Sequence, residues 1–166
     1  MKRILLFWCA AVLLCCCGRQ DDSGKFSYHG LSLRLTTDAF VDSMVARGFA
    51  VDSSASDSGR TIVMASEAVP YRVLAGIRNQ QLLVVQETYR LSTNDSTRRL
   101  WQQLRDGLEK ELGAWPDCPI LKDDHKVANF DAAEGIISVV LENTYKPTLT
   151  VRYVPKQGPE THTPQR

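Results

Sequence analysis

The chain lacks an excess of charge of either sign, a long apolar run and a set of cysteines in its body. Lysine and arginine total 20 and aspartate and glutamate total 19 among the 166 residues. This balance argues against a broad basic face, so we expect no nucleic-acid partner. No window of the sequence holds the roughly 18 apolar residues that a membrane-spanning helix needs, which excludes a polytopic membrane protein.

Cysteine is concentrated at one end of the chain. Four of the five cysteines lie in the first 17 residues, and Cys118 is the fifth. This distribution does not support a disulfide framework in the body of the protein. We expect Cys118 to be a structural free thiol, with intermolecular pairing as the alternative.

The amino terminus has the pattern of a secretory signal peptide. Lys2 and Arg3 precede the apolar run Ile4–Leu14, which has 11 residues. A helix of that length reaches about 16 Å, roughly half of a hydrocarbon core of about 30 Å. The run is therefore too short for a span and is typical of the apolar region of a signal peptide.

The residues after this run are Leu14-Cys15-Cys16-Cys17-Gly18. They resemble the lipobox of bacterial lipoprotein precursors, in which a leucine and then a small residue precede the cysteine that is acylated. The resemblance implies that residues 1–16 are a signal peptide and that Cys17 is lipidated, with cleavage before Cys16 as the alternative. Acyl chains contribute about 0.8 kcal/mol per buried CH₂, so two or three of them hold a small domain on a membrane.

The resemblance also implies a location in the bacterial cell envelope. Gly18 is not the aspartate that retains many lipoproteins in the inner membrane, so we expect anchoring in the outer membrane. Residues 17–28 are expected to be an acylated, flexible tether. Its segment Gly18–Asp22 is similar to the acidic tether of surface-exposed Bacteroidota lipoproteins, and a plain solvated linker is the alternative.

Hydrophobic periodicity predicts one domain over residues 29–154, followed by a disordered tail over 155–166. Alternating leucines predict a first strand over 31–35. A helix capped at Thr36 or Thr37 follows, and a second helix carries leucines four residues apart and ends at Gly113. Further strands are expected over the following ranges: 61–65, 71–77, 81–89, 126–130, 136–142 and 148–154.

This order predicts an α+β fold. Because no crossover helix separates successive strands, we expect an antiparallel sheet of about six or seven strands with both helices on one face. A helix followed by three strands occurs twice, as a weak repeat. The arrangement resembles small envelope lipoproteins, including outer-membrane assembly factors, the β-lactamase-inhibitor-protein type and Bacteroidota lipoproteins. Gly48-Phe49 and Trp115-Pro116 carry the last likeness.

Alternation along the last two strands separates two faces of the sheet. One set is expected to face the helices: Ile137, Val139, Leu141, Leu149, Val151 and Tyr153. Thr150 and Arg152 then lie on the opposite face, together with apolar residues such as Val140 and Val154. That mixed face is our candidate binding surface.

Motifs for catalysis are missing. The ligand types in Asp123-Asp124-His125 are adjacent rather than converging, and Asp52 and Asp57 fit an ordinary polar loop, so we predict no metal site and no cofactor. Glu67, Glu87 and Glu142 are the carboxylates that a glycosidase could use, but strand carboxylates usually mark a wet face. No catalytic residue is predicted.

A modification signal occurs twice. Asp95-Ser96-Thr97 and Asp42-Ser43-Met44 are similar to the short motif at which Bacteroidota glycosylate exported proteins. Ser96 is the better candidate because we place it in a loop.

Three functions remain open. We favour a non-enzymatic, lipid-anchored binding or accessory module whose partner is a protein or a glycan. An envelope hydrolase acting on carbohydrate or peptide is the alternative, and an inhibitor-type lipoprotein is the third.

Overall fold

The structure, a computed structural model, describes residues 26–57 and 59–156. The signal peptide, Cys17 and the tail beyond Lys156 lie outside this part of the chain. The helices of the described residues are α1 (Thr37–Ala46) and α2 (Asn94–Leu112). The strands are β1 (Ala50–Val51), β2 (Thr61–Ala65), β3 (Tyr71–Arg78), β4 (Gln81–Arg90), β5 (Asp117–Lys122), β6 (His125–Ala132), β7 (Gly135–Glu142) and β8 (Thr148–Pro155).

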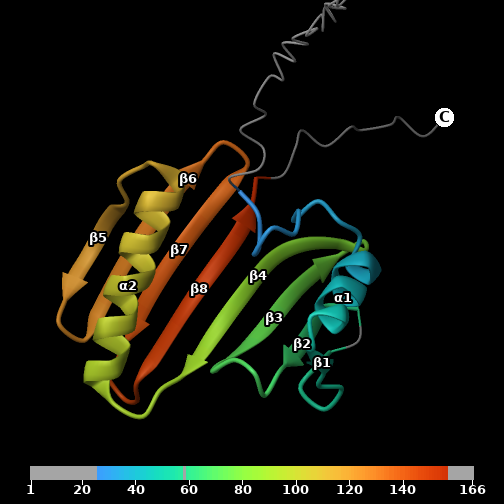
Figure 1. The fold of residues 1–166 in the computed structure, drawn as a ribbon, viewed down its shortest axis with the longest axis horizontal. Helices are drawn as coiled ribbons and strands as arrows, with labels where there is room; N and C mark the ends of the chain where they lie inside the picture. Colours follow the sequence, from blue (N-terminus) through green and yellow to red (C-terminus); the bar gives the residue numbers. More distant parts are fainter. Residues whose placement is uncertain (1–25, 58, 157–166) are drawn as a thin grey trace, which may run out of the picture.

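All of these strands join one antiparallel sheet in the order β1-β2-β3-β4-β8-β7-β6-β5 (Figure 1). Each half of the chain is one helix followed by a meander of four strands, and β4 pairs with β8 where the halves meet. The predicted α+β class, the antiparallel pairing and the two helices are confirmed. The predicted strand number is wrong, because the described chain has eight strands and each half has four rather than three.

The two strands that the sequence pattern did not predict are weak by local criteria. Strand β1 has two residues, too few for any periodicity to register. Strand β5 contains Pro119, and its register against β6 shifts between Asp117 and Ile120. Proline has no N–H to donate, so it is tolerated here because β5 is an edge strand.

The predicted strand over residues 31–35 is wrong. His29 and Gly30 have positive φ angles of 47° and 79°, and they turn the chain so that Tyr28 bridges Leu31. The alternating leucines belong to an irregular segment laid over the core, with Leu33 buried. Their spacing imitates a strand because every second side chain faces the protein interior.

The described end of the predicted tether is part of the domain. Phe26 and Tyr28 are only 4% and 1% exposed, although we expected a flexible tether up to residue 28. A Cβ atom on Gly135 would collide with the ring of Phe26, so the glycine provides the space in which Phe26 packs. At the other end of the domain, the backbone N–H of Lys156 donates to Glu134 at 2.7 Å. Residues 155 and 156 therefore belong to the domain and not to the predicted tail.

The predicted N-cap of α1 and the predicted end of α2 are confirmed, whereas the cap of α2 was not predicted. Thr36 caps α1 by accepting a hydrogen bond from the Ala39 N–H. Thr93 and Ser96 form a capping box at the start of α2, and Gly113 ends that helix with a left-handed φ of 64°. Trp101, rather than the leucine stripe, anchors α2. It is buried, and its indole N–H donates to the Val139 carbonyl at 3.1 Å.

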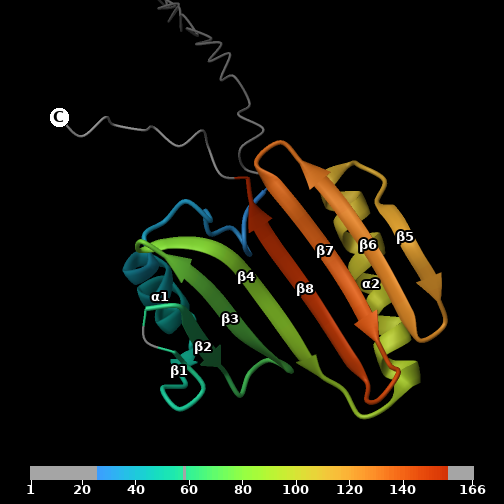
Figure 2. The same ribbon diagram turned by 180° about the vertical axis from the view of Figure 1, so that it is seen from behind.

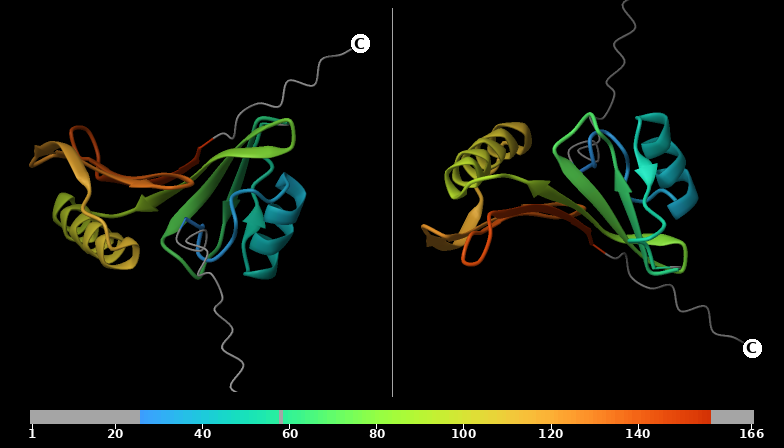
Figure 3. Two further views of the ribbon diagram at one scale, coloured as in Figure 1. Left: turned by 90° about the horizontal axis from the view of Figure 1, so that it is seen from above. Right: turned by 90° about the horizontal axis from the view of Figure 1, so that it is seen from below.

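Both helices lie on the same side of the sheet (Figure 3). Figure 2 shows the sheet from behind. The strand register places one buried row across the sheet on that side: Met64, Val73, Glu87, Val151, Val139 and Ala128. All six residues that we expected to face the helices on β7 and β8 are buried. Within the described residues, neither helix is long and apolar enough to cross a membrane.

Candidate functional site

One face of the sheet carries no helix of the described chain, as Figure 2 shows. We call this surface the open face. Thr150 is half-buried and Arg152 is exposed on it, as the alternation predicted. Arg152 lies between Gln86 of β4 and Ser138 of β7. The neighbouring row places Thr150 between Thr88 and Val140.

The open face is mixed in character. Ile136 is 39% exposed and pairs with Val154 next to Arg152. Ser138 donates to the side-chain oxygen of Asn129 at 2.8 Å. The face therefore combines apolar side chains with a central cation and hydroxyl and amide groups, which suits a surface that is alternately hydrated and bound.

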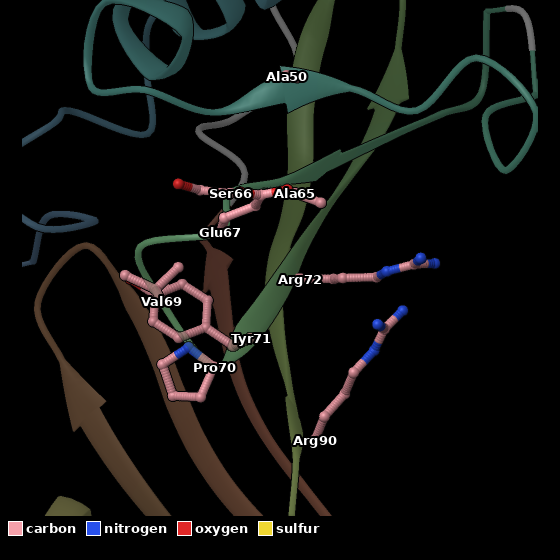
Figure 4. A pocket seen from close by; sticks show the side chains of 9 residues that line it. All are labelled: Ala50, Ala65, Ser66, Glu67, Val69, Pro70, Tyr71, Arg72 and Arg90. Atoms are coloured by element: carbon pink, nitrogen blue, oxygen red, sulfur yellow. The ribbon is translucent and has the colours of Figure 1, made fainter.

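At the β1–β2–β3 end of the sheet lies a pocket of about 440 Å³ (Figure 4). Ala50, Ala65 and Arg72 are cross-strand neighbours, and the two small alanine side chains leave the space. Arg72 and Arg90 extend to the same side of the strands. The full lining is Ala50, Ala65, Ser66, Glu67, Val69, Pro70, Tyr71, Arg72 and Arg90. Sequence reasoning missed this site because the two arginines are far apart in the chain and meet only through the β3–β4 pairing.

A buried carboxylate lies on the helix side of the sheet. Glu87 is 1% exposed. One of its oxygens lies 2.6 Å from Nε2 of His29, and the other accepts a hydrogen bond from the Tyr89 hydroxyl at 2.7 Å. Tyr28 packs edge-on against His29, and Tyr71 stacks on it. We call this group the Glu87 cluster.

The Glu87 cluster perturbs the ionisation of its members. The hydrogen bond from His29 to Glu87 raises the pKa of that imidazole. Burial, followed by the nearby Glu87 charge, raises the pKa values of Tyr28 and Tyr89 far above their ordinary range. The tyrosines therefore stay protonated. The Tyr89 hydroxyl donates to Glu87, whereas the buried Tyr28 hydroxyl has no hydrogen-bond partner among the described residues. His29 belongs to the segment at residues 26–36 and Glu87 belongs to β4, so their contact holds that segment against the sheet. The pocket lining includes neither residue.

The three carboxylates considered for glycoside hydrolysis do not converge. Glu87 points to the helix side of the sheet, whereas Glu142 belongs to the opposite face and pairs with Thr144 and with His125. Glu67 lies in the loop between β2 and β3. A pair on opposite faces cannot flank one glycosidic bond.

The acidic loops are occupied by local contacts. Asp52 accepts hydrogen bonds from Ser54 and Ala55, which lower the pKa of its carboxyl. Asp124 pairs with Arg98 at 2.6 Å. In the part of the chain that the structure describes, no group of three histidine, cysteine or acidic residues is placed to hold a metal ion.

The candidate modification sites lie in helices. We expected Ser96 in a loop, but it is in the first turn of α2, where its hydroxyl takes part in the capping box. Thr97 of the same motif is buried. Ser43 lies in α1 and donates to the Ala39 carbonyl at 2.7 Å. Cys118 is a half-buried free thiol.

Comparison of the chain with protein-family models, curated proteins and solved structures finds no match.

Proposed function

We propose that this chain is a lipid-anchored lipoprotein of the bacterial cell envelope and that it acts as a non-enzymatic binding or accessory module. The observation that carries the binding role is the open face, a wide sheet surface that no described helix covers. An exposed arginine at its centre is the residue type that most often anchors a protein interface, together with tryptophan and tyrosine. The resemblance of Leu14–Cys17 to a lipobox supports the anchor.

The place where the anchor would attach is compatible with a free open face. Phe26 packs against Gly135, at the turn between β6 and β7, so a tether from Cys17 reaches the domain at that end of the sheet. The nine residues 17–25 span at most about 32 Å. A domain held in this way stays close to the membrane, and its open face remains free for a partner in the envelope.

The anchor is tested by replacing Cys17 with serine. We expect Cys17→Ser to abolish metabolic labelling with fatty acid and to leave an uncleaved precursor, because serine has no thiol to acylate. Labelling that persists in Cys17→Ser and disappears in Cys16→Ser moves the site by one residue. Labelling of the variant that lacks both cysteines contradicts the lipoprotein assignment.

The binding surface is tested by reversing the charge of Arg152. A photo-crosslinking residue at Thr150 of the lipidated protein should trap the partner in intact cells. We expect Arg152→Glu to remove this crosslink while the melting temperature stays within a few degrees, because exposed substitutions cost about 0.5 kcal/mol or less. Arg99→Glu, which reverses an exposed charge on α2, is the matched control and should keep the crosslink. Crosslinks that survive Arg152→Glu contradict the proposed surface.

A further inference from the structure

We infer that the pocket beside Arg72 and Arg90 is a binding site for a small organic oxyanion, a molecule that carries a carboxylate or a phosphate on an apolar body. The site is separate from Arg152 and does not depend on the lipid anchor. Its volume of about 440 Å³ lies within the usual range for small-molecule pockets.

The positive charge of Arg72 and Arg90 is only partly neutralised by the other described residues. The register places Arg72 opposite Thr88, so Arg90 is its diagonal neighbour on the adjacent strand, and both side chains extend to the same side (Figure 4). Among the described residues, Asp52 is paired with Arg72, with its Oδ2 3.7 Å from Nη1 of that arginine. That distance exceeds a hydrogen bond, and the other oxygen of Asp52 is engaged by Ser54 and Ala55.

An unpaired donor marks the same place. The Nε of Arg72 is buried, and no acceptor among the described residues pairs with it. Buried polar groups are almost always hydrogen-bonded, so this nitrogen lacks an acceptor that the described chain does not supply. A carboxylate or phosphate suits this position because guanidinium groups bind these anions through paired hydrogen bonds.

The rest of the lining defines the body of the ligand. Ala50 and Ala65 line the pocket with small side chains, and Val69 and Pro70 add apolar side chains to the lining. The lining also includes one carboxylate, that of Glu67, which forms no ion pair with either arginine among the described residues. The pocket thus offers charge at one end and apolar contact at the other, the arrangement that orients a small amphipathic acid.

The test follows arginine Nε–Hε signals in the isotopically labelled full chain by NMR. Benzoate and phenyl phosphate are the probes, and benzyl alcohol is the neutral control. We expect saturable shifts of the Arg72 and Arg90 signals with at least one charged probe and none with the alcohol. The probe that saturates identifies carboxylate or phosphate as the preferred anion.

Variants separate the pocket from nonspecific charge effects. Arg72→Gln combined with Arg90→Gln should weaken binding by about tenfold or more, the effect of losing at least one charge-assisted hydrogen bond. Because this variant lacks both arginine signals, its binding is followed through the backbone amide signals of Ser66 and Glu67 in the pocket lining. Arg99→Gln, which removes an exposed cation on α2, should leave affinity within about twofold. Absence of saturation with both charged probes, or equal binding by the double variant with its native spectrum retained, overturns the inference. Neither result affects the proposed function, because the crosslinking experiment with Arg152→Glu tests that proposal separately.

Discussion

Val151→Asp should abolish folding of the domain, whereas Thr150→Asp one residue earlier should leave it folded. Val151 is 1% exposed and lies between Glu87 of β4 and Val139 of β7. An aspartate there is a buried charge without a cation, placed directly opposite a buried carboxylate. The cost of one unpaired buried ion is several kcal/mol, comparable with the whole stability of a small domain.

The matched variant tests which face is covered. Thr150 belongs to the open face, so its aspartate is hydrated, and we expect a loss of about 1 kcal/mol or less. Far-UV circular dichroism and urea denaturation of the two variants measure the difference. Equal damage from both substitutions would show that the open face is packed against something, and the proposed binding surface would be wrong.

His29→Ala should destabilise the domain by about 2–3 kcal/mol, the cost of leaving a buried charged acceptor without its partner. The side chain of Glu87 is only 2% exposed, and His29 provides its charged contact at 2.6 Å. Adding Glu87→Gln to His29→Ala should recover part of the loss. The amide carries no charge and still offers an oxygen to the Tyr89 hydroxyl. Urea denaturation measures each variant, and an undiminished loss in the double variant contradicts this account.

The same pair predicts a dependence of stability on pH. Glu87 raises the pKa of His29, and the charged groups that also act on it are Arg47, which lowers the value, and Glu111, which raises it. The folded protein therefore keeps a proton that the unfolded chain loses above about pH 6.5. The His29–Glu87 pair therefore contributes fully to folding stability below that pH, and this contribution is lost as the pH rises through the raised pKa of His29. The stability gap between wild type and His29→Ala should shrink accordingly, measured with His125→Gln present in both proteins.

Several elements could be predicted from the sequence because they depend on interactions between residues that are close together in the chain. The caps at Thr36 and Gly113 could be predicted because backbone N–H and C=O groups at helix ends lack partners within the helix and must be hydrogen-bonded by nearby residues. The faces of β7 and β8 follow from the twofold alternation of a strand, so the exposure of Arg152 and the burial of Val151 were both predictable. Cys17, the other predicted site, lies outside the described residues and stays a prediction.

Other features depend on contacts that no local pattern records. In sequence, Glu87 resembles any solvated strand carboxylate, because its partner His29 lies 58 residues away. The leucines at 31–35 alternate as a strand does, yet two positive φ angles turn the segment over the core.

By itself, the sequence determined the fold class, the start of α1, the end of α2 and the two faces of the final strands, since these depend on interactions over a few residues. The tertiary structure alone decided the β4–β8 pairing, the Glu87 cluster and the pocket at Arg72 and Arg90. Those features arise from strand register, which brings together residues that are distant in the chain. Register is set by the packing of the whole sheet and not by any segment within it.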